Sequence, residues 1–152
     1  MPVYFADTSA LAKLYVVETG SSWLRSLDLS DLTVSILALP EIGSVLFRRE
    51  RQGALSGPTH RRAWRAFRAD FRGWAVIRLS RPVLDGAVAL FRDRSLPVML
   101  RTLDALHLAT ALRVRGRARL GGTTPLTFLT ADDRLEAAAR HFGFATDNPN
   151  RH

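Results

Sequence analysis

Short apolar segments alternate with longer amphipathic segments along this chain, and no other feature of the sequence restricts its fold as strongly. Short runs rich in β-branched residues predict buried strands at 3–6, 33–37, 75–79, 126–129 and 144–146. Segments with a helical period predict helices from about residue 10 and at 21–27, 40–52, 60–74, 82–94, 102–114 and 132–141, and the arginine- and glycine-rich stretch 116–125 predicts a loop. Strands that alternate with helices favour an α/β fold in which helices cover both faces of a parallel sheet.

The length and composition are typical of one soluble domain spanning residues 1–152. With 47% apolar residues, a chain of this length buries enough surface to fold without disulfides or structural metals. The sequence contains no cysteine, which excludes disulfides, thiolate metal sites and cysteine nucleophiles. We expect a cytoplasmic protein with no membrane partner, because the sequence shows neither a secretory leader nor an apolar run approaching the roughly 20 residues that span a bilayer.

The chain is strongly basic, with a formal net charge of +8, and Lys13 is the only lysine among its 22 basic residues. GC-rich coding can inflate arginine content without any functional cause. The alternative is a polyanionic partner such as RNA, because arginine binds phosphate through two parallel hydrogen bonds.

One predicted helix, at 60–74, carries two parallel stripes of side chains. The aromatic stripe consists of Trp64, Phe67 and Phe71, and beside it lies a basic stripe formed by Arg61, Arg65, Arg68 and Arg72. The basic stripe is a candidate contact for the phosphate backbone of RNA. It could equally be the solvated face of a helix whose aromatic side packs into the core.

Four acidic residues lie in apolar surroundings, unlike most of the 14 in the chain: Asp7, Glu41, Asp104 and Asp132. Asp7 and Asp132 follow predicted strands, so both are expected at the edge where a parallel sheet binds ligands. Asp104 lies in the first turn of a predicted helix, where the helix dipole favours an anion. A lone buried carboxylate is costly unless it is paired or binds a metal, so the four together predict a site for Mg²⁺ or Mn²⁺.

Each acid also has a purely structural interpretation. Asp7 could cap the first helix, Asp104 could interact with the dipole of its own helix, and Glu41 could pair with an arginine. Thr130 and Asp133 have the spacing of a capping box, with Thr130 as the N-cap. That box would leave the neighbouring Asp132 without a structural role.

The residues around the four acids resemble the PIN-domain ribonucleases and, within them, the VapC-type toxins of bacterial toxin–antitoxin pairs. The resemblance covers about residues 3–139 and is carried, in order, by YFADTSALAKLY, LPEIGSVLFRR, LRTLDALHLATAL and TFLTADDRL. It implies a three-layer α/β/α sandwich with a parallel central sheet, Mg²⁺ or Mn²⁺, and endonucleolytic cleavage of RNA. It also implies a homodimer and a VapB-like protein antitoxin.

On this interpretation Asp7, Asp104 and Asp132 bind the metal, and Glu41 does so directly or through water. Water activated at the metal attacks the scissile phosphorus in line, which leaves 5′-phosphate and 3′-hydroxyl ends.

Five neighbours of the acids have less definite roles. Thr8 and Ser9 either hydrogen-bond a ligand carboxylate or cap the helix, and Thr130 is expected to be a cap. Asp133 is a second aspartate directly after Asp132, so the sequence leaves open whether Asp132 alone binds the metal. His107 is expected to be packed and hydrogen-bonded rather than a metal ligand.

Three other classes of protein share part of this pattern. A phosphatase that forms an aspartyl-phosphate on Asp7 would carry a second aspartate two residues later, where this chain has Ser9. A non-catalytic RNA-binding module would be expected to lack one of the acids, yet all four are present. A housekeeping RNA-processing nuclease with the same site remains open.

Overall fold

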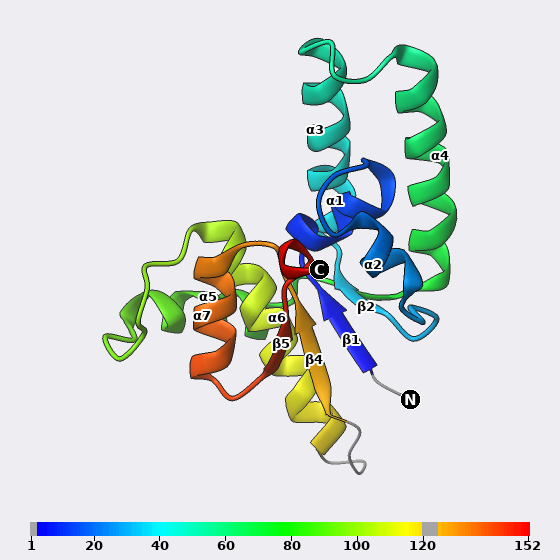
Figure 1. The fold of residues 1–152 in the computed structure, drawn as a ribbon. Helices are drawn as coiled ribbons and strands as arrows, with labels where there is room; N and C mark the ends of the chain where they lie inside the picture. The colour runs from blue at the N-terminus through cyan, green and yellow to red at the C-terminus, as the bar shows by residue number, and fades with distance from the viewer. Residues whose placement is uncertain (1–2, 120–124) are drawn as a thin grey trace.

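A computed structural model describes residues 3–119 and 125–152 and shows a parallel sheet between two layers of helices (Figure 1). The strand order is β3-β2-β1-β4-β5, and every neighbouring pair is parallel. The strands are β1 (Val3–Ala6), β2 (Thr33–Ser35), β3 (Ala75–Ile77), β4 (Leu126–Leu129) and β5 (Ala145–Asp147). Because the sheet is parallel, its strands end at one common edge.

The helices form two groups, one on each face of the sheet. The first group is α1 (Thr8–Tyr15), α2 (Ser21–Ser26), α3 (Ala38–Arg51) and α4 (Gly57–Gly73). The second is α5 (Arg81–Arg92), α6 (Thr102–Arg119) and α7 (Asp133–His141). Figure 1 shows α3 and α4 as a hairpin that projects beyond the sheet.

Side-chain alternation along the strands explains the two helical layers. Phe5 of β1 and its partner Phe128 of β4 point to one face and belong to the core formed with α5, α6 and α7. The next pair, Ala6 and Leu129, belongs to the core formed with α1–α4. Successive strand residues face opposite sides, so one sheet supplies both cores. The three-layer α/β/α architecture is confirmed.

The aromatic stripe of α4 packs as its spacing predicts. Phe67 is fully buried, Trp64 and Phe71 are half-buried beside it, and Tyr15 of α1 meets Phe67 edge-on with ring centroids 5.4 Å apart. Aromatic side chains bury large areas, so this stripe fixes the α3–α4 hairpin to α1. The arginines of the basic stripe stay on the exposed side of the helix.

Several predicted boundaries are wrong. Helix α6 continues past the expected end at residue 114 to Arg119, so 116–119 are helical, and residues 120–124 of the predicted loop lie outside the described part. Thr102 was expected to cap this helix but is its first residue. Helix α4 begins at Gly57, earlier than predicted, because the hydroxyl of Ser56 accepts a hydrogen bond from the backbone N–H of Thr59 at 3.2 Å.

The C-terminal residues pack back onto the domain through a buried carboxylate, Glu136 of α7, which is only 2% exposed. It accepts hydrogen bonds from Arg140, Arg151 and Thr146. Burial alone would raise the pKa of Glu136, but these hydrogen bonds and the two arginine charges outweigh it and lower the pKa. The last turn, a 3₁₀ helix at Pro149–Arg151, is therefore held beside α7 and α2.

None of the helices in the described residues is both long enough and apolar enough to span a bilayer.

Candidate active site

Three helices begin close to the edge where the strands end, and each carries an aspartate in or just before its first turn. Asp7 follows β1 and precedes α1, Asp132 lies between β4 and α7, and Asp104 is in the first turn of α6. A hydrogen bond of 3.1 Å from the Asp7 N–H to the Leu129 carbonyl joins the ends of β1 and β4. The order of the parallel strands therefore brings the first and fourth acids to adjacent positions.

Asp7 is the N-cap of α1, as its structural interpretation predicts. Its Oδ1 accepts hydrogen bonds from the Ser9 hydroxyl at 2.8 Å and from the Ala10 N–H at 3.3 Å. The side chain is only 5% exposed. Burial raises the pKa of Asp7, although the His107 ring, the Ser9 hydroxyl and backbone N–H groups oppose that rise.

Asp132 is the N-cap of α7, which corrects the prediction that Thr130 would have this role. The Oδ1 of Asp132 accepts hydrogen bonds from the N–H groups of Arg134 at 2.8 Å and Leu135 at 3.1 Å. The expected capping box between Thr130 and Asp133 does not form, because the helix starts at Asp133 instead of Ala131. The interpretation that leaves Asp132 without a structural role is therefore wrong.

Asp104 reaches back to the residue before its helix. Its Oδ2 lies 3.3 Å from the backbone N–H of Arg101, which donates to it. Desolvation is the main cause that raises the pKa of Asp104, and the negative charge of Asp132 raises it further, against the opposing effects of Arg101 and His107. The influence of Asp132 indicates that the third and fourth acids are near enough to repel each other.

On each of these three aspartates, the described hydrogen bonds use one carboxylate oxygen and leave the other oxygen available. The bonds described for Asp7 and Asp132 fall on Oδ1, and the bond to Asp104 falls on Oδ2. One oxygen of each carboxylate therefore serves the helix, and the other can serve a cation. A structural cap and a metal ligand are compatible functions of the same residue here.

A chain of hydroxyl groups links the first and fourth acids. The Asp132 N–H donates to Thr130 Oγ1 at 3.1 Å, Thr130 and Ser9 hydroxyls are 3.2 Å apart, and Ser9 donates to Asp7. Ser9 also accepts from the Ala131 N–H at 2.9 Å. Because the Ser9 proton goes to Asp7, Thr130 is the donor to Ser9. Ser9 does bond an acid of the cluster, and Thr130 bridges the two loops rather than capping the helix.

Glu41, the remaining acid of the cluster, forms a hydrogen bond with a histidine. Glu41 lies in the first turn of α3, and its Oε1 is 2.6 Å from Nε2 of His107 on α6. His107 is 2% exposed, and the same Nε2 lies 3.4 Å from the Thr8 hydroxyl. The expectation that His107 is packed and hydrogen-bonded is confirmed, but its partner is one of the four acids.

The charges of three acids act on the His107 ring. Burial alone would lower the pKa of His107, but the hydrogen bond to Glu41 and the negative charges of Asp7, Glu41 and Asp104 outweigh it and raise the pKa. His107 therefore lies near enough to these three acids for their charges to act on its ring, and it hydrogen-bonds Glu41. The spacing of three residues from Asp104, which places both on one side of a helix, was the available signal for this role.

The donor chemistry of the cluster suits a hard divalent cation. Carboxylate oxygens are what Mg²⁺ and Mn²⁺ bind, and a cation would relieve the repulsion that raises the Asp104 pKa. Across residues 3–119 and 125–152, however, no three His, Asp or Glu side chains converge as a ready metal-binding group. The acids are brought to one edge of the sheet, and an ion would draw their remaining oxygens together.

The other candidate residues lie apart from this network. Asp133 accepts hydrogen bonds from Asn148 at 2.9 Å and from Arg151 at 3.3 Å, so its carboxylate serves the C-terminal segment. The arginines of the basic stripe are exposed along α4, and within the described residues none of them forms an ion pair. Arg68 lies over the Trp64 ring, 5.9 Å from its centroid.

The arrangement matches a known domain. The family model described as the PIN domain matches residues 4–141, a region that contains all four acids. The chain belongs to the PIN-domain family. Among curated proteins, this PIN domain is 35% identical to Ribonuclease VapC46 of Mycobacterium tuberculosis over 152 residues, which cover 99% of this chain and 100% of that protein. At this identity over the whole length, it belongs with the VapC ribonucleases.

Solved structures share the fold at lower identity. The PIN domain superposes on VapC20 of Mycobacterium tuberculosis, described as a toxin that cleaves the sarcin–ricin loop, with a TM-score of 0.65 and 18% identity over 93% of this chain and 96% of that one. It also superposes on a chain of a toxin–antitoxin complex from Klebsiella pneumoniae, with a TM-score of 0.61 and 17% identity over 98% of both chains. These likenesses show the α/β fold of the domain.

Proposed function

We propose that this PIN domain is a Mg²⁺- or Mn²⁺-dependent endoribonuclease and the toxin of a toxin–antitoxin pair, acting in the cytoplasm. One observation carries the proposal: Asp7, Asp104 and Asp132 stand at adjacent helix starts, and His107 links the cluster to Glu41. The whole-length similarity to a VapC ribonuclease supports RNA as the substrate. A housekeeping RNA-processing nuclease with the same site is the alternative.

In the proposed mechanism the acids bind the metal, and the groups that hydrogen-bond the acids orient them. Asp7, Asp104 and Asp132 would hold the cation through their remaining oxygens, with Glu41 as a direct or water-mediated fourth ligand. When bound, the cation supplies Lewis acidity toward the scissile phosphate and toward the attacking water. The chain of Thr130 and Ser9 hydroxyls orients the Asp7 carboxylate, and the caps on α1 and α7 fix the backbone beneath it.

Divalent metal should govern both activity and stability. We expect the purified protein to cut RNA with Mg²⁺ or Mn²⁺, leaving 5′-phosphate and 3′-hydroxyl ends, and EDTA to stop cleavage. Either ion should also raise the melting temperature, because binding to the folded state alone stabilises it by about 2.7 kcal/mol at 100 times the dissociation constant. End-sequencing of the cut RNA and thermal melts test this. Full activity of demetallated protein in EDTA would refute the metal mechanism.

The basic stripe of α4 is the proposed grip on the RNA backbone. Neutralising Arg61 and Arg65 together should weaken RNA binding and reduce the slope of log affinity against log salt by up to about 0.7 for each lost contact on single strands. Binding titrations with non-cleaving protein at several salt concentrations measure that slope. Arg113, an exposed arginine on α6, is the control position. A slope that stays the same would leave the stripe as solvated surface.

A protein antitoxin is the proposed partner, and two features of the surface suit it. The acid cluster attracts a basic side chain, so an arginine or lysine of the antitoxin could pair with it and block RNA. Near the first helices, Val17 is 81% exposed and Phe47 is 62% exposed, which offers apolar contacts to an amphipathic helix that folds on binding. The structural neighbours include a toxin–antitoxin complex, which supports this kind of partner.

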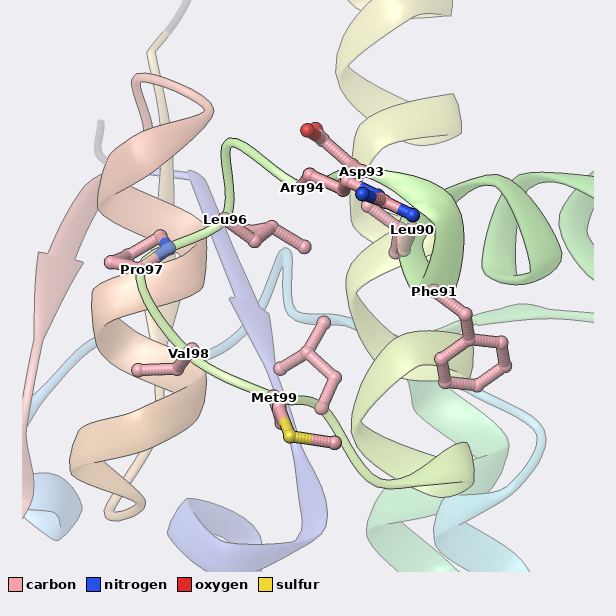
Figure 2. A pocket seen from close by; sticks show the side chains of 9 residues that line it. Leu90, Phe91, Asp93, Arg94, Leu96, Pro97, Val98 and Met99 are labelled. Carbon is pink, nitrogen blue, oxygen red and sulfur yellow. The ribbon is translucent and has the colours of Figure 1, made fainter.

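A homodimer is also proposed, and the surface of α5 is the candidate interface. Leu84, Val88 and Phe91 recur at helical spacing and are all exposed, and Met99 is 86% exposed beside them. Figure 2 shows Phe91, Leu96 and Met99 around a hollow of about 470 Å³ between α5 and the segment that leads into α6. Contiguous apolar surface of this kind marks interaction sites, and one patch can pair with its own copy across a twofold axis.

Disrupting this surface should separate the dimer. We expect Val88→Arg to sediment as a monomer at concentrations where the wild type is dimeric, because two buried arginines would face each other across the axis. Analytical ultracentrifugation measures the change, and Arg48→Glu, at an exposed position on α3, is the control. A Val88→Arg protein that remains dimeric would place the interface elsewhere.

A further inference from the structure

The hydrogen bond between His107 and Glu41 fixes a side chain that would otherwise move. Glu41 has three rotatable bonds and is half-buried at the start of α3, and ordering such a side chain costs conformational entropy. Its carboxylate meets Nε2 of His107 at 2.6 Å. Because an ionised carboxylate only accepts hydrogen bonds, Nε2 carries the proton and donates. With Nε2 used in this way, His107 acts on Glu41 rather than as a metal ligand.

The cost of burying His107 argues that its role is not packing. The ring lies within the apolar stretch of α6, and Nδ1 is buried with no hydrogen-bond partner among the described residues. A polar atom in that state is unfavourable, and a leucine would fill the same space without the cost. All the polar contacts described for the ring, to Glu41 and Thr8, are directed toward the acid cluster.

We propose that His107 is a positioning residue that holds the Glu41 carboxylate at the acid cluster, so that a divalent cation finds this carboxylate already in place. The inference rests on the proposed metal-dependent function and adds a residue to it. Groups that hydrogen-bond metal ligands orient them, and their loss typically weakens metal binding by about 10- to 100-fold. Helices α3 and α6, from opposite faces of the sheet, are joined at the site by this bond.

The test compares three substitutions by the binding of Mn²⁺, measured by electron paramagnetic resonance. His107→Leu removes the donor and keeps a similar volume, so the Mn²⁺ dissociation constant should rise about 10- to 100-fold. His107→Gln places an amide N–H near the position of Nε2 and should restore most of the affinity. Thr110→Val is the matched control: Thr110 is fully buried one turn further along α6, and its hydroxyl is bonded to the Leu106 carbonyl.

A double substitution separates positioning from a general structural effect. In a Glu41→Gln background, His107→Leu should cause little further loss of Mn²⁺ affinity, because the residue it positions is already altered. Thermal melts in EDTA should show that His107→Leu is at least as stable as the wild type. An equal or tighter Mn²⁺ dissociation constant in His107→Leu would overturn the inference, as would losses that simply add in the double variant.

Failure of this inference differs from failure of the proposed function. If wild-type protein binds Mn²⁺ and cuts RNA while His107→Leu does both equally well, only the positioning role is lost. If wild-type protein binds no Mn²⁺, both the proposed metal-dependent function and the positioning role of His107 are wrong.

Discussion

Asp104→Asn should reduce the rate of RNA cleavage by at least roughly 1,000-fold, and Asp7→Asn and Asp132→Asn should do the same. Each substitution keeps the shape of the side chain and removes the charge that would hold a divalent cation. Single-turnover cleavage of a defined RNA at saturating Mg²⁺ measures the loss. Near wild-type cleavage by Asp104→Asn would exclude it from the metal site.

These variants should remain folded, because asparagine caps helices as well as aspartate does. Without metal they should melt at the same temperature as wild type or higher. The raised pKa values of Asp7 and Asp104 mean that their ionised forms are disfavoured in the fold, and that penalty grows as pH rises from the ordinary carboxyl pKa through the raised values. The stability gain of Asp7→Asn and Asp104→Asn should therefore be present at neutral pH and absent in acid.

Asp133→Asn is the control that the chain itself provides. Asp133 is adjacent to Asp132 and chemically identical, but its carboxylate bonds Asn148 and Arg151 in the C-terminal segment. Its substitution should cost some stability and little activity. If Asp133→Asn is inactive while Asp132→Asn cuts RNA, the assignment of the fourth acid is wrong.

The fold was largely predictable because its determinants are local. The short, largely apolar runs at 3–6 and 126–129 favour buried strands of a parallel sheet, and Asp7, directly after the first of them, is then expected at the ligand-binding edge. The end of α6 was not predictable in this way. Gly116 and its arginine neighbours suggest a loop, yet the helix continues through them to Arg119. Helix α5 packs along the middle of α6, with Gly86 close to Ala109.

The four acids of the site could be predicted from the sequence, but the groups that hydrogen-bond them could not. Which residue caps α7 depends on a shift of two residues in the helix start, and both Thr130 and Asp132 are good capping residues. The bond between Glu41 and His107 depends on how α3 and α6 approach each other across the sheet, 66 residues apart in sequence. No local pattern encodes that contact, so His107 read in isolation resembles a packed histidine.

Expression of this chain without a partner should arrest growth of its host, and this is the largest biological effect that the proposed function predicts. Asp104, Asp132 and Glu41 are partly exposed at the sheet edge, so RNA could reach the acid cluster until an antitoxin covers it. Co-expression of the protein encoded beside it should restore growth, and Asp7→Asn should be harmless at equal abundance. Growth curves after induction, with sequencing of newly cut RNA ends, measure both effects.

If wild-type protein, shown to be folded and metal-loaded, neither slows growth nor cuts cellular RNA in its native host, the toxin assignment fails. Cutting of one precursor RNA without growth arrest would instead identify a processing nuclease.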